Sequence, residues 1–272
     1  MDRTRRTKKT YSFLWRRIKE VHPVEKWHFN KMQEVLDEPI PRGIIGIDIG
    51  SGCGYDTYIM AKNNPSIKII SIDISDGVYT TRKLTSNLKN VYIIKCSVSD
   101  IPLKKSIFDF AYSFGVLHHT VNPKKCISEI SRVLKKQAPI FAYLYEDHSE
   151  NPIRHIAVKI ISKLRIITPK LHPKILYVLC WLTSPFIFVI FSFPSKILKQ
   201  FKLTGSLYKK IPFNFGTGFF SLCDDLYDRL SAPIEHRFSR QKAYELFSES
   251  GFQNIGITRL NDSAGWVIWG YK

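Results

Sequence analysis

Cysteine is scarce in this chain, and its few copies are scattered. The 272 residues include five cysteines, and no two of them have C-x-x-C spacing: Cys53, Cys96, Cys126, Cys180 and Cys223. This pattern excludes a zinc knuckle and a disulfide framework, and it favours a reduced chain in the cytoplasm. The basic N-terminal stretch runs into an apolar patch that is too short for a signal-peptide core, so we expect no secretion.

Acidic residues are also few. Against 41 Lys and Arg there are 23 Asp and Glu, which leaves a formal net charge of +18 at pH 7. So large a charge excludes an ordinary neutral enzyme surface and favours an anionic partner, which is membrane lipid, nucleic acid or a phosphorylated substrate. A lysine-rich composition without such a partner is the alternative. Hydrophobic residues make up 44% of the chain, which is typical of a globular protein.

Short apolar runs alternate with helical segments in the first half of the chain. Strands are predicted at residues 43–49, 67–72, 91–94, 108–113 and 139–145. A helix at 239–250 and two strands at 254–260 and 265–271 resume the alternation near the C-terminus. This order predicts an α/β fold with a doubly wound, mainly parallel sheet that a C-terminal hairpin completes.

The pattern predicts four parts along the chain. An N-terminal segment, 1–42, is helical over 11–37 and is closed by Pro39 and Pro41. The other three parts are a core at 43–147, a basic and apolar helical insertion at 148–238, and the completion of the sheet at 239–272.

A glycine-rich loop follows the first predicted strand. Residues 48–54 read D-I-G-S-G-C-G, and such glycines permit a tight turn and a close approach of a ligand to the backbone. Asp73 ends the second strand, where its carboxylate can accept hydrogen bonds from both hydroxyls of a ribose. The spacing differs from the G-x-G-x-x-G of dinucleotide sites, and no G-K-[ST] run is present, so a phosphate cradle is not favoured.

With this order of strand, loop, helix and acid, the chain resembles the class I S-adenosylmethionine-dependent methyltransferases. It is most similar to the small-molecule and lipid branch typified by the ubiquinone and menaquinone methyltransferases. The resemblance is close over 43–147 and looser over 239–272, and it also rests on Ile101-Pro102, Phe108-Asp109, the run 115–119 and the run 129–135. It implies a seven-stranded Rossmann-like sheet, methyltransferase activity and S-adenosyl-L-methionine as the cofactor.

The resemblance also implies which residues bind the cofactor. Gly50, Ser51 and Gly52 would contact its methionine end, Asp73 its ribose and Ile74 its adenine. The other positions assigned to the cofactor site are Asp48, Gly54, Ser97, Val98 and Ser113. Ser97 departs from the family, which usually has an acid there; the Val98 backbone and Asp100 are the possible substitutes.

Two adjacent histidines are the candidate catalytic residues. Methyl transfer from a sulfonium mainly needs alignment and exclusion of water, and a hydroxyl acceptor is helped by a general base. His118 and His119 follow the fourth strand at its carboxyl end, where open α/β sheets place ligands. The alternative is a capping or packing role. No third ligand stands at useful spacing, so no metal site is predicted.

The expected acceptor is a small apolar or amphiphilic molecule: a lipid, a quinone-like ring, or a lipid-linked glycan or other envelope precursor. An RNA methyltransferase that uses the basic surface is the alternative. However, the turn 113–116 reads S-F-G-V. It lacks the Pro-Pro turn that is similar among the enzymes that methylate amino groups of nucleic acids. A catalytically silent scaffold is a third hypothesis. The sequence leaves the oligomeric state open.

The insertion contains two apolar segments. Residues 152–167 predict a basic amphipathic helix, suited to an anionic membrane interface or to a lid over the core. Residues 175–195 carry no charge and are long enough to cross a bilayer, yet Ser184-Pro185 divides them. Because strands of one sheet flank the insertion, we expect a helical hairpin bent at Ser184-Pro185 that does not cross.

The expected location is therefore cytoplasmic, peripheral at the inner face of the membrane. The polar stretch after the insertion's apolar segments adds Asp228, His236 and Arg237 as further candidates for the acceptor pocket. An ordinary loop held by salt bridges is the alternative for these three residues.

Overall fold

The chain folds into two units. The computed structural model describes residues 3–17, 24–35, 44–201, 207–213, 219–260 and 265–272. Unit 1 comprises Met1–Glu146 and Ile234–Lys272, and unit 2 comprises Asp147–Pro233. The sequence placed the insertion at 148–238. Pro39 and Pro41, which were expected to close the N-terminal helical segment, lie outside the described residues.

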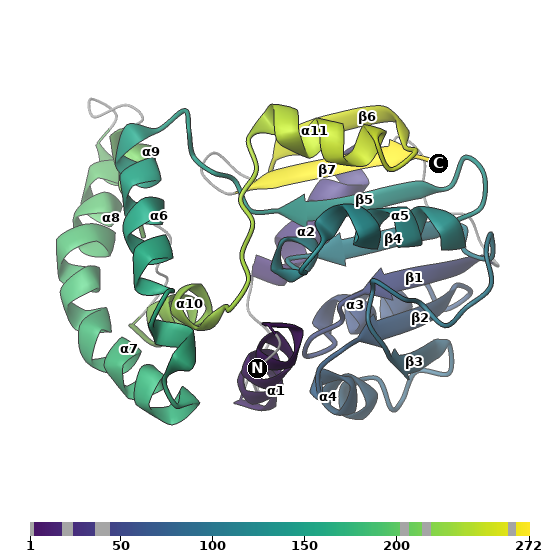
Figure 1. Cartoon of the computed structure of the whole chain (residues 1–272), viewed down its shortest axis with the longest axis horizontal. Helices are drawn as coiled ribbons and strands as arrows, with labels where there is room; N and C mark the ends of the chain where they lie inside the picture. Colours follow the sequence, from purple (N-terminus) through teal and green to yellow (C-terminus); the bar gives the residue numbers. More distant parts are fainter. Residues whose placement is uncertain (1–2, 18–23, 36–43, 202–206, 214–218, 261–264) are drawn as a thin grey trace. The chain divides into compact units, whose positions relative to one another are not determined.

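Unit 1 is built on a single sheet. Its described strands are β1 (Ile45–Ile49), β2 (Lys68–Asp73), β3 (Val91–Lys95), β4 (Phe110–Phe114), β5 (Pro139–Leu144), β6 (Gln253–Arg259) and β7 (Trp266–Tyr271). They form a seven-stranded sheet in the order β3-β2-β1-β4-β5-β7-β6, shown in Figure 1. The first five strands are parallel, and β7 runs antiparallel to both β5 and β6. The predicted α/β fold with its C-terminal hairpin is confirmed.

Helices cover both faces of this sheet, because its central strands are apolar on both sides. On one face, α5 (Pro123–Val133) and α11 (Arg240–Ser248) pack on a cluster that includes Ile49, Ile140 and Ile268. On the other, α2 (Val24–Val35) and α3 (Tyr55–Asn63) pack on Tyr112 and Phe141. A doubly wound sheet of this kind presents its ligand site at the carboxyl ends of the strands.

The described parts of the N-terminal segment, 3–17 and 24–35, are helical. Helix α1 (Arg3–Arg17) contacts α4 (Gly77–Leu84), the helix that follows β2, and α2 packs beside α3. Ser12 Oγ accepts a hydrogen bond of 2.9 Å from the backbone N–H of Asp76, and Arg16 forms an ion pair with the Asp76 carboxylate at 2.6 Å. These contacts fix α1 next to the end of β2.

Unit 2 is helical throughout its described part. It contains α6 (Pro152–Leu164), a 3-10 turn η2 (Thr168–Lys170), α7 (Pro173–Ile187), η3 (Phe188–Ser192), α8 (Phe193–Gln200), α9 (Leu207–Lys210) and α10 (Phe219–Ser231). Two of the helices begin at an X-Pro pair. The Asn151 side chain caps α6 by accepting from the Arg154 N–H, and His172 caps α7 by accepting from the Lys174 N–H. Proline at the first helical position needs no hydrogen bond of its own.

The predicted break into a helical hairpin at Ser184-Pro185 is wrong. Pro185 lies inside α7, and the helix continues through η3 into α8, so that Pro173–Gln200 forms one helix of 28 residues. After the proline, the helix widens to a π-type turn over Phe188–Ser192. The Ser184 hydroxyl meanwhile donates to the Cys180 carbonyl at 2.6 Å. A proline therefore lies inside this helix without ending it.

Candidate active site

The loop after β1 has a backbone that only glycine adopts readily. Gly50, Gly52 and Gly54 all have positive φ, at 81°, 55° and 92°. A Cβ on Gly50 would lie 2.2 Å from the Val116 side chain, and one on Gly54 would lie 2.6 Å from Thr81 Cα. The N–H groups of Gly50 and Ser51 both donate to the Ile72 carbonyl, at 2.7 and 3.1 Å. The loop is thus fixed against the end of β2.

Asp73 is held in place at the end of β2. Its Oδ2 accepts from the Gly52 N–H at 2.9 Å, and its Oδ1 accepts from the Ser75 N–H at 2.6 Å. Each carboxylate oxygen can accept more than one hydrogen bond. The two backbone donors therefore orient the carboxylate beside the glycine loop and leave it able to accept hydroxyl groups.

Asp48 lies beneath the loop. Its carboxylate is 2% exposed and accepts a hydrogen bond from Thr57, the third residue of α3. Burial raises the pKa of Asp48 to about 7, the Thr57 hydrogen bond opposes that rise, and the charge of Asp73 adds to it. The side chain therefore supports the loop from below, on the side away from solvent.

The other residues assigned to the cofactor site follow the next strands. Ile74 is half-buried directly after Asp73. Ser97 Oγ lies 2.9 Å from Ser99 Oγ, Val98 is buried, and Asp100 is exposed. At the end of β4, the Ser113 hydroxyl is fully buried and donates to the Ile49 carbonyl at 3.3 Å, so it ties β4 to the start of the loop.

Both histidines are buried in the turn after β4, in the 3-10 turn η1 (Leu117–His119). The His118 ring stacks on Tyr145, with ring centroids 3.7 Å apart. His119 Nδ1 lies 2.8 Å from the Ile234 carbonyl, which requires a proton on Nδ1. In the neutral ring this bond selects the tautomer whose lone pair is on Nε2, which is the form that a general base needs.

Two ion pairs lie near Tyr145 in the sequence or in space. Arg237 lies over the Tyr145 ring at 5.2 Å and forms an ion pair of 2.6 Å with Glu235. Glu146 follows Tyr145 and pairs with Arg259 at 2.7 Å. His236 also joins this region, since its N–H donates to the His118 carbonyl at 2.8 Å. The structure thus brings His236 and Arg237 beside the two histidines, whereas Asp228 belongs to unit 2.

Helix α1 contributes residues that the sequence analysis did not identify. The Trp15 ring lies 3.0 Å from the point where a Cβ on Gly52 would be. Trp15 stacks on Tyr11, at 5.8 Å between centroids, and Tyr11 in turn contacts the His119 ring at 5.3 Å. These aromatic rings connect the glycine loop to the candidate base. The available signal was the aromatic run 11–15, but nothing in that run specifies its partners.

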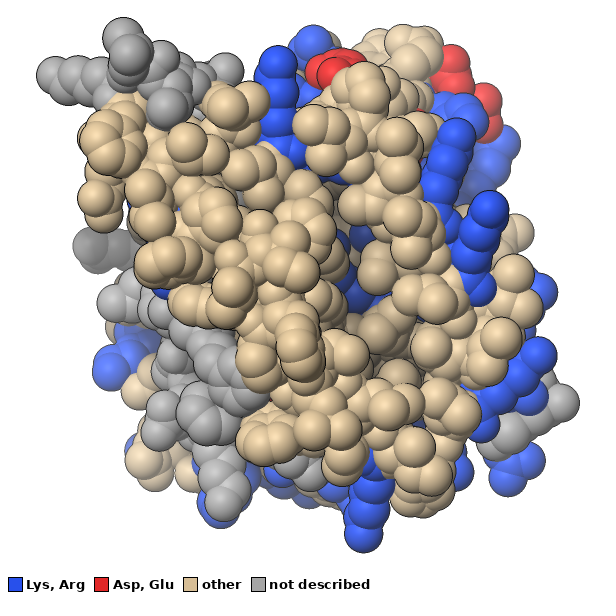
Figure 2. Space-filling model, turned by 90° about the vertical axis from the view of Figure 1, so that its left-hand side faces the viewer, with Lys and Arg blue, Asp and Glu red and all other residues tan. Residues whose placement is uncertain are grey.

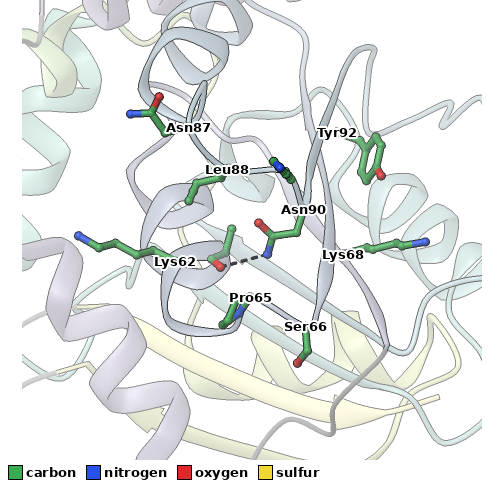
Figure 3. A pocket seen from close by; sticks show the side chains of 10 residues that line it. Lys62, Pro65, Ser66, Lys68, Asn87, Leu88, Asn90 and Tyr92 are labelled. Carbon is green, nitrogen blue, oxygen red and sulfur yellow. Dashed lines mark hydrogen bonds between the residues drawn. The ribbon is translucent and has the colours of Figure 1, made fainter.

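A cavity of about 390 Å³ lies elsewhere in unit 1. Lys62, Lys68 and Tyr92 are among the residues that line it, around the start of β2 and the loop before β3 (Figure 3). Lys68 begins β2 and Asp73 ends it, so the cavity and the glycine loop lie at opposite ends of that strand. The cavity contains none of the residues assigned to the cofactor or to catalysis.

The residues around the glycine loop fit S-adenosylmethionine. Positive φ values at three glycines let a ligand approach the backbone, and Asp73 presents paired acceptors suited to a ribose. Asp48 and Ser113 fix the loop to its neighbours through Thr57 and Ile49. Bound there, the cofactor would supply an activated methyl group.

Comparisons with known proteins point to the same chemistry. Residues 42–165 match a family described as a methyltransferase domain. A tRNA U34 carboxymethyltransferase of Ruthia magnifica is 34% identical over 93 residues, which cover 33% of this chain and 29% of that protein. A tRNA (carboxymethyluridine(34)-5-O)-methyltransferase of Saccharomyces cerevisiae is 34% identical over 114 residues, 40% of this chain and 39% of that protein.

The name of a third relative contains a hydroquinone with a phytyl group. The 2-methyl-6-phytyl-1,4-hydroquinone methyltransferase of Spinacia oleracea is 28% identical over 107 residues, 38% of this chain and 31% of that protein. The chain thus spans about a third of the length of these relatives. A solved S-adenosylmethionine-dependent methyltransferase from Aquifex aeolicus shares the fold, with a TM-score of 0.54 at 13% identity over 100% of this chain and 98% of that one.

The fold, the glycine loop with Asp73 and the family match agree. Residues 42–165 match a methyltransferase domain, the fold is that of solved S-adenosylmethionine-dependent methyltransferases, and S-adenosylmethionine is the cofactor that these matches and the glycine loop indicate.

Proposed function

We propose that this protein transfers a methyl group from S-adenosylmethionine to an apolar or amphiphilic acceptor, such as a lipid, a quinone-like ring or a lipid-linked precursor. The observation that carries the proposal is the composition of the wall around His119. The rings of Tyr11 and Tyr145 lie 5.3 and 5.4 Å from the His119 ring. Arg237 and Arg259 nearby are each paired with a glutamate. A ring-lined wall with balanced charges suits an uncharged group better than a phosphate backbone.

The roles of the chain's own residues follow from their positions. The glycine loop and Asp73 would hold and orient the cofactor. For a hydroxyl acceptor, His119 Nε2 would take the hydroxyl proton as the methyl carbon bonds to the acceptor oxygen and its bond to the cofactor sulfur breaks, which leaves a neutral thioether. The Ile234 carbonyl would keep the ring in the required tautomer. Tyr11 and Trp15 would cover the site and limit the access of water, which keeps the reacting groups aligned.

RNA is the second candidate acceptor. It is supported by the two relatives named as tRNA methyltransferases and by the net charge of +18, which suits a phosphate backbone. The aligned parts of both relatives cover well under half of their own lengths. The sequence similarity therefore covers part of the methyltransferase domain and does not by itself assign the acceptor.

A labelled-methyl assay distinguishes the two acceptors. The full chain is incubated with methyl-labelled cofactor and with separate lipid, RNA and small-metabolite fractions of the native cell. We expect label in the lipid fraction, and we expect His119→Gln to lower the rate by about 10²-fold or more, with cofactor binding unchanged. Asp73→Ala, which should lose cofactor binding, is the control for enzyme-dependent transfer. Label confined to RNA would replace the proposed acceptor by the second candidate.

A further inference from the structure

The apolar face of α6 points away from the rest of unit 2. Ile153, Ile156, Ile160 and Leu164 are all exposed, at about half of their full area. On the inward side, Arg154 is buried, and its guanidinium donates to the Ile211 carbonyl at 3.2 Å. An amphipathic helix that packs on a water-soluble core has the reverse orientation.

The 28-residue helix Pro173–Gln200 has the same inverted arrangement. The side chains that it buries are small or polar apart from one leucine: Leu176, Cys180, Ser184, Ser192 and Ser195. The Ser192 hydroxyl, for example, donates to the Phe213 carbonyl at 2.6 Å. Ten of its large apolar side chains are exposed: Ile175, Val178, Leu179, Trp181, Leu182, Phe186, Val189, Ile190, Phe193 and Ile197. Helices pack through small residues and expose large apolar ones where lipid replaces water.

This apolar surface, which we define as the exposed apolar residues of α6 and of Pro173–Gln200, is broad. Figure 2, which shows the left-hand side of Figure 1, has a wide area without Asp or Glu, with Lys and Arg mainly at its margins and in a hollow within it. Monomeric soluble proteins rarely expose an apolar area that contains so many large side chains. The surface therefore requires a partner that is itself apolar.

The charges of the same segment are all of one sign. Residues 151–223 contain eleven Lys and Arg and no Asp or Glu. Six of these lysines lie in or beside the apolar helices and are exposed: Lys159, Lys163, Lys170, Lys174, Lys196 and Lys199. A bilayer with anionic headgroups matches both features, because its interior takes apolar side chains and its surface attracts lysines. RNA would match the lysines alone.

We infer that unit 2 docks on an anionic lipid bilayer, with α6 and Pro173–Gln200 lying in its interface and their flanking lysines on the headgroups. This docking requires no methyl transfer, and it stands independently of the acceptor proposed above. It would also bring a membrane-embedded acceptor to the enzyme.

The docked helix does not cross the bilayer. Among the described residues, Pro173–Gln200 is the one helix long and apolar enough to do so. However, β5 before the insertion pairs directly with β7 after it, so both ends of unit 2 return to a single sheet. One crossing would separate these two strands by a membrane. The helix therefore lies along the interface, where lipid covers its exposed apolar face.

Vesicle flotation tests the inference. The full chain is mixed with vesicles of phosphatidylcholine alone or of phosphatidylcholine with phosphatidylglycerol. We expect binding that requires the anionic lipid. Phe186→Gln with Ile190→Gln should weaken it at least about tenfold, because two apolar side chains lose their burial in lipid. Lys159→Gln should weaken it about fivefold, and high salt should weaken it further.

A matched control variant is Tyr244→Gln, which removes an exposed aromatic side chain from α11 in unit 1. It should leave vesicle binding unchanged. Cofactor binding by calorimetry should be the same in all of these variants, which shows that they are folded. The calorimetry also separates failure of the docking from failure of the proposed reaction. If the wild-type protein binds cofactor but no vesicles, the docking is wrong and the proposed reaction is unaffected.

Two further outcomes would overturn the inference. If Phe186→Gln with Ile190→Gln abolishes a concentration-dependent dimer and wild type binds no vesicles, the partner of the apolar surface is a second copy. Single cysteines at positions 170 and 200, on protein bound to sealed vesicles, should both react with an impermeant maleimide added outside. Protection of one of them by the vesicle would mean that the helix crosses.

Discussion

The core of unit 1 and the long helix Pro173–Gln200 of unit 2 bury different kinds of side chain. In unit 1 the largest fully buried residues are aromatic or branched, such as Tyr112, Phe141 and Phe247, as expected for a core formed in water. In unit 2 the long helix buries serines and a cysteine and exposes side chains such as Phe186 and Trp181. The difference teaches that a core of large apolar side chains accounts for unit 1 but not for the exposed face of this helix, which the proposed docking on lipid would cover.

The largest expected contrast comes from the same truncation in each unit. Phe141→Ala should lower the free energy of unfolding by about 3–5 kcal/mol, because it opens a cavity in the centre of the sheet. Phe186→Ala should change it by no more than about 0.5 kcal/mol, since that side chain is 69% exposed. Urea titration measures both values. A large loss for Phe186→Ala would break the comparison by showing that its face is covered in water.

A second contrast is that unit 1 buries a carboxylate. The pKa of Asp48 is raised to about 7, so the folded chain keeps this proton between about pH 4 and 7 while the unfolded chain releases it. The folded state then binds more protons, and its stability falls as pH rises through that window, on the order of a few kcal/mol in total. Asp48→Asn should remove this fall while it keeps an acceptor for Thr57.

Unfolding free energies at pH 5 and pH 8 for wild type and Asp48→Asn measure this effect. Burial lowers the pKa of His28 to about 4, which gives stability that rises with pH up to about 6.5. That slope is the same in both proteins and cancels in their difference. An equal pH dependence for the two would show that Asp48 is ionised in the folded chain at pH 5.

Cofactor binding should depend on unit 1 alone. Asp73→Ala should weaken the binding of S-adenosylmethionine by about 1.5–3 kcal/mol in calorimetry, the scale of lost charge-assisted hydrogen bonds. Asp73→Asn should lose less, because it keeps one acceptor oxygen. Phe186→Ala is the counterpart in unit 2 and should have no effect. Unchanged affinity in a folded Asp73→Ala protein would contradict the role given to this carboxylate.

The smallest effect concerns the serines buried in unit 2. Ser184→Ala removes a fully buried hydroxyl that donates to the Cys180 carbonyl, and it should cost about 0.5–1.5 kcal/mol of stability. Thr183→Ala is a close control, because Thr183 makes a similar bond to the Leu179 carbonyl from an exposed position. Equal losses for neighbours on opposite faces would show that burial of the hydroxyl does not matter.

The sequence predicts the sheet well because the short apolar runs and their order along the chain are enough to identify the strands. Runs such as 67–72 and 139–145 are apolar, short and bounded by turn residues, and they correspond to β2 and β5 within one residue at each end. The glycine loop and Asp73 were identifiable because consecutive residues form the loop, and Asp73 ends the next strand. Motifs of this kind are local in sequence and therefore visible without a structure.

What the sequence did not give has two physical causes. Helical periodicity shows that Ile153, Ile156 and Ile160 share a face, but it does not show whether that face points inward. The role of Tyr11 depends on packing against His119, more than a hundred residues away, which no local pattern encodes. Pro185 was misinterpreted for a related reason, since a proline in the sequence does not by itself show whether a helix ends there, and this helix continues past it.

The position of β7 between β5 and β6 has a consequence for synthesis. A ribosome makes β5 first, then all of unit 2, and only then the strand that pairs with β5. For more than a hundred residues of elongation the edge of β5 is open, at the same time as the apolar helices emerge. Open edges and apolar helices are both sites of aggregation in nascent chains. If the helices dock on a membrane while translation continues, their apolar side chains are covered before β7 is made and pairs with the open edge of β5.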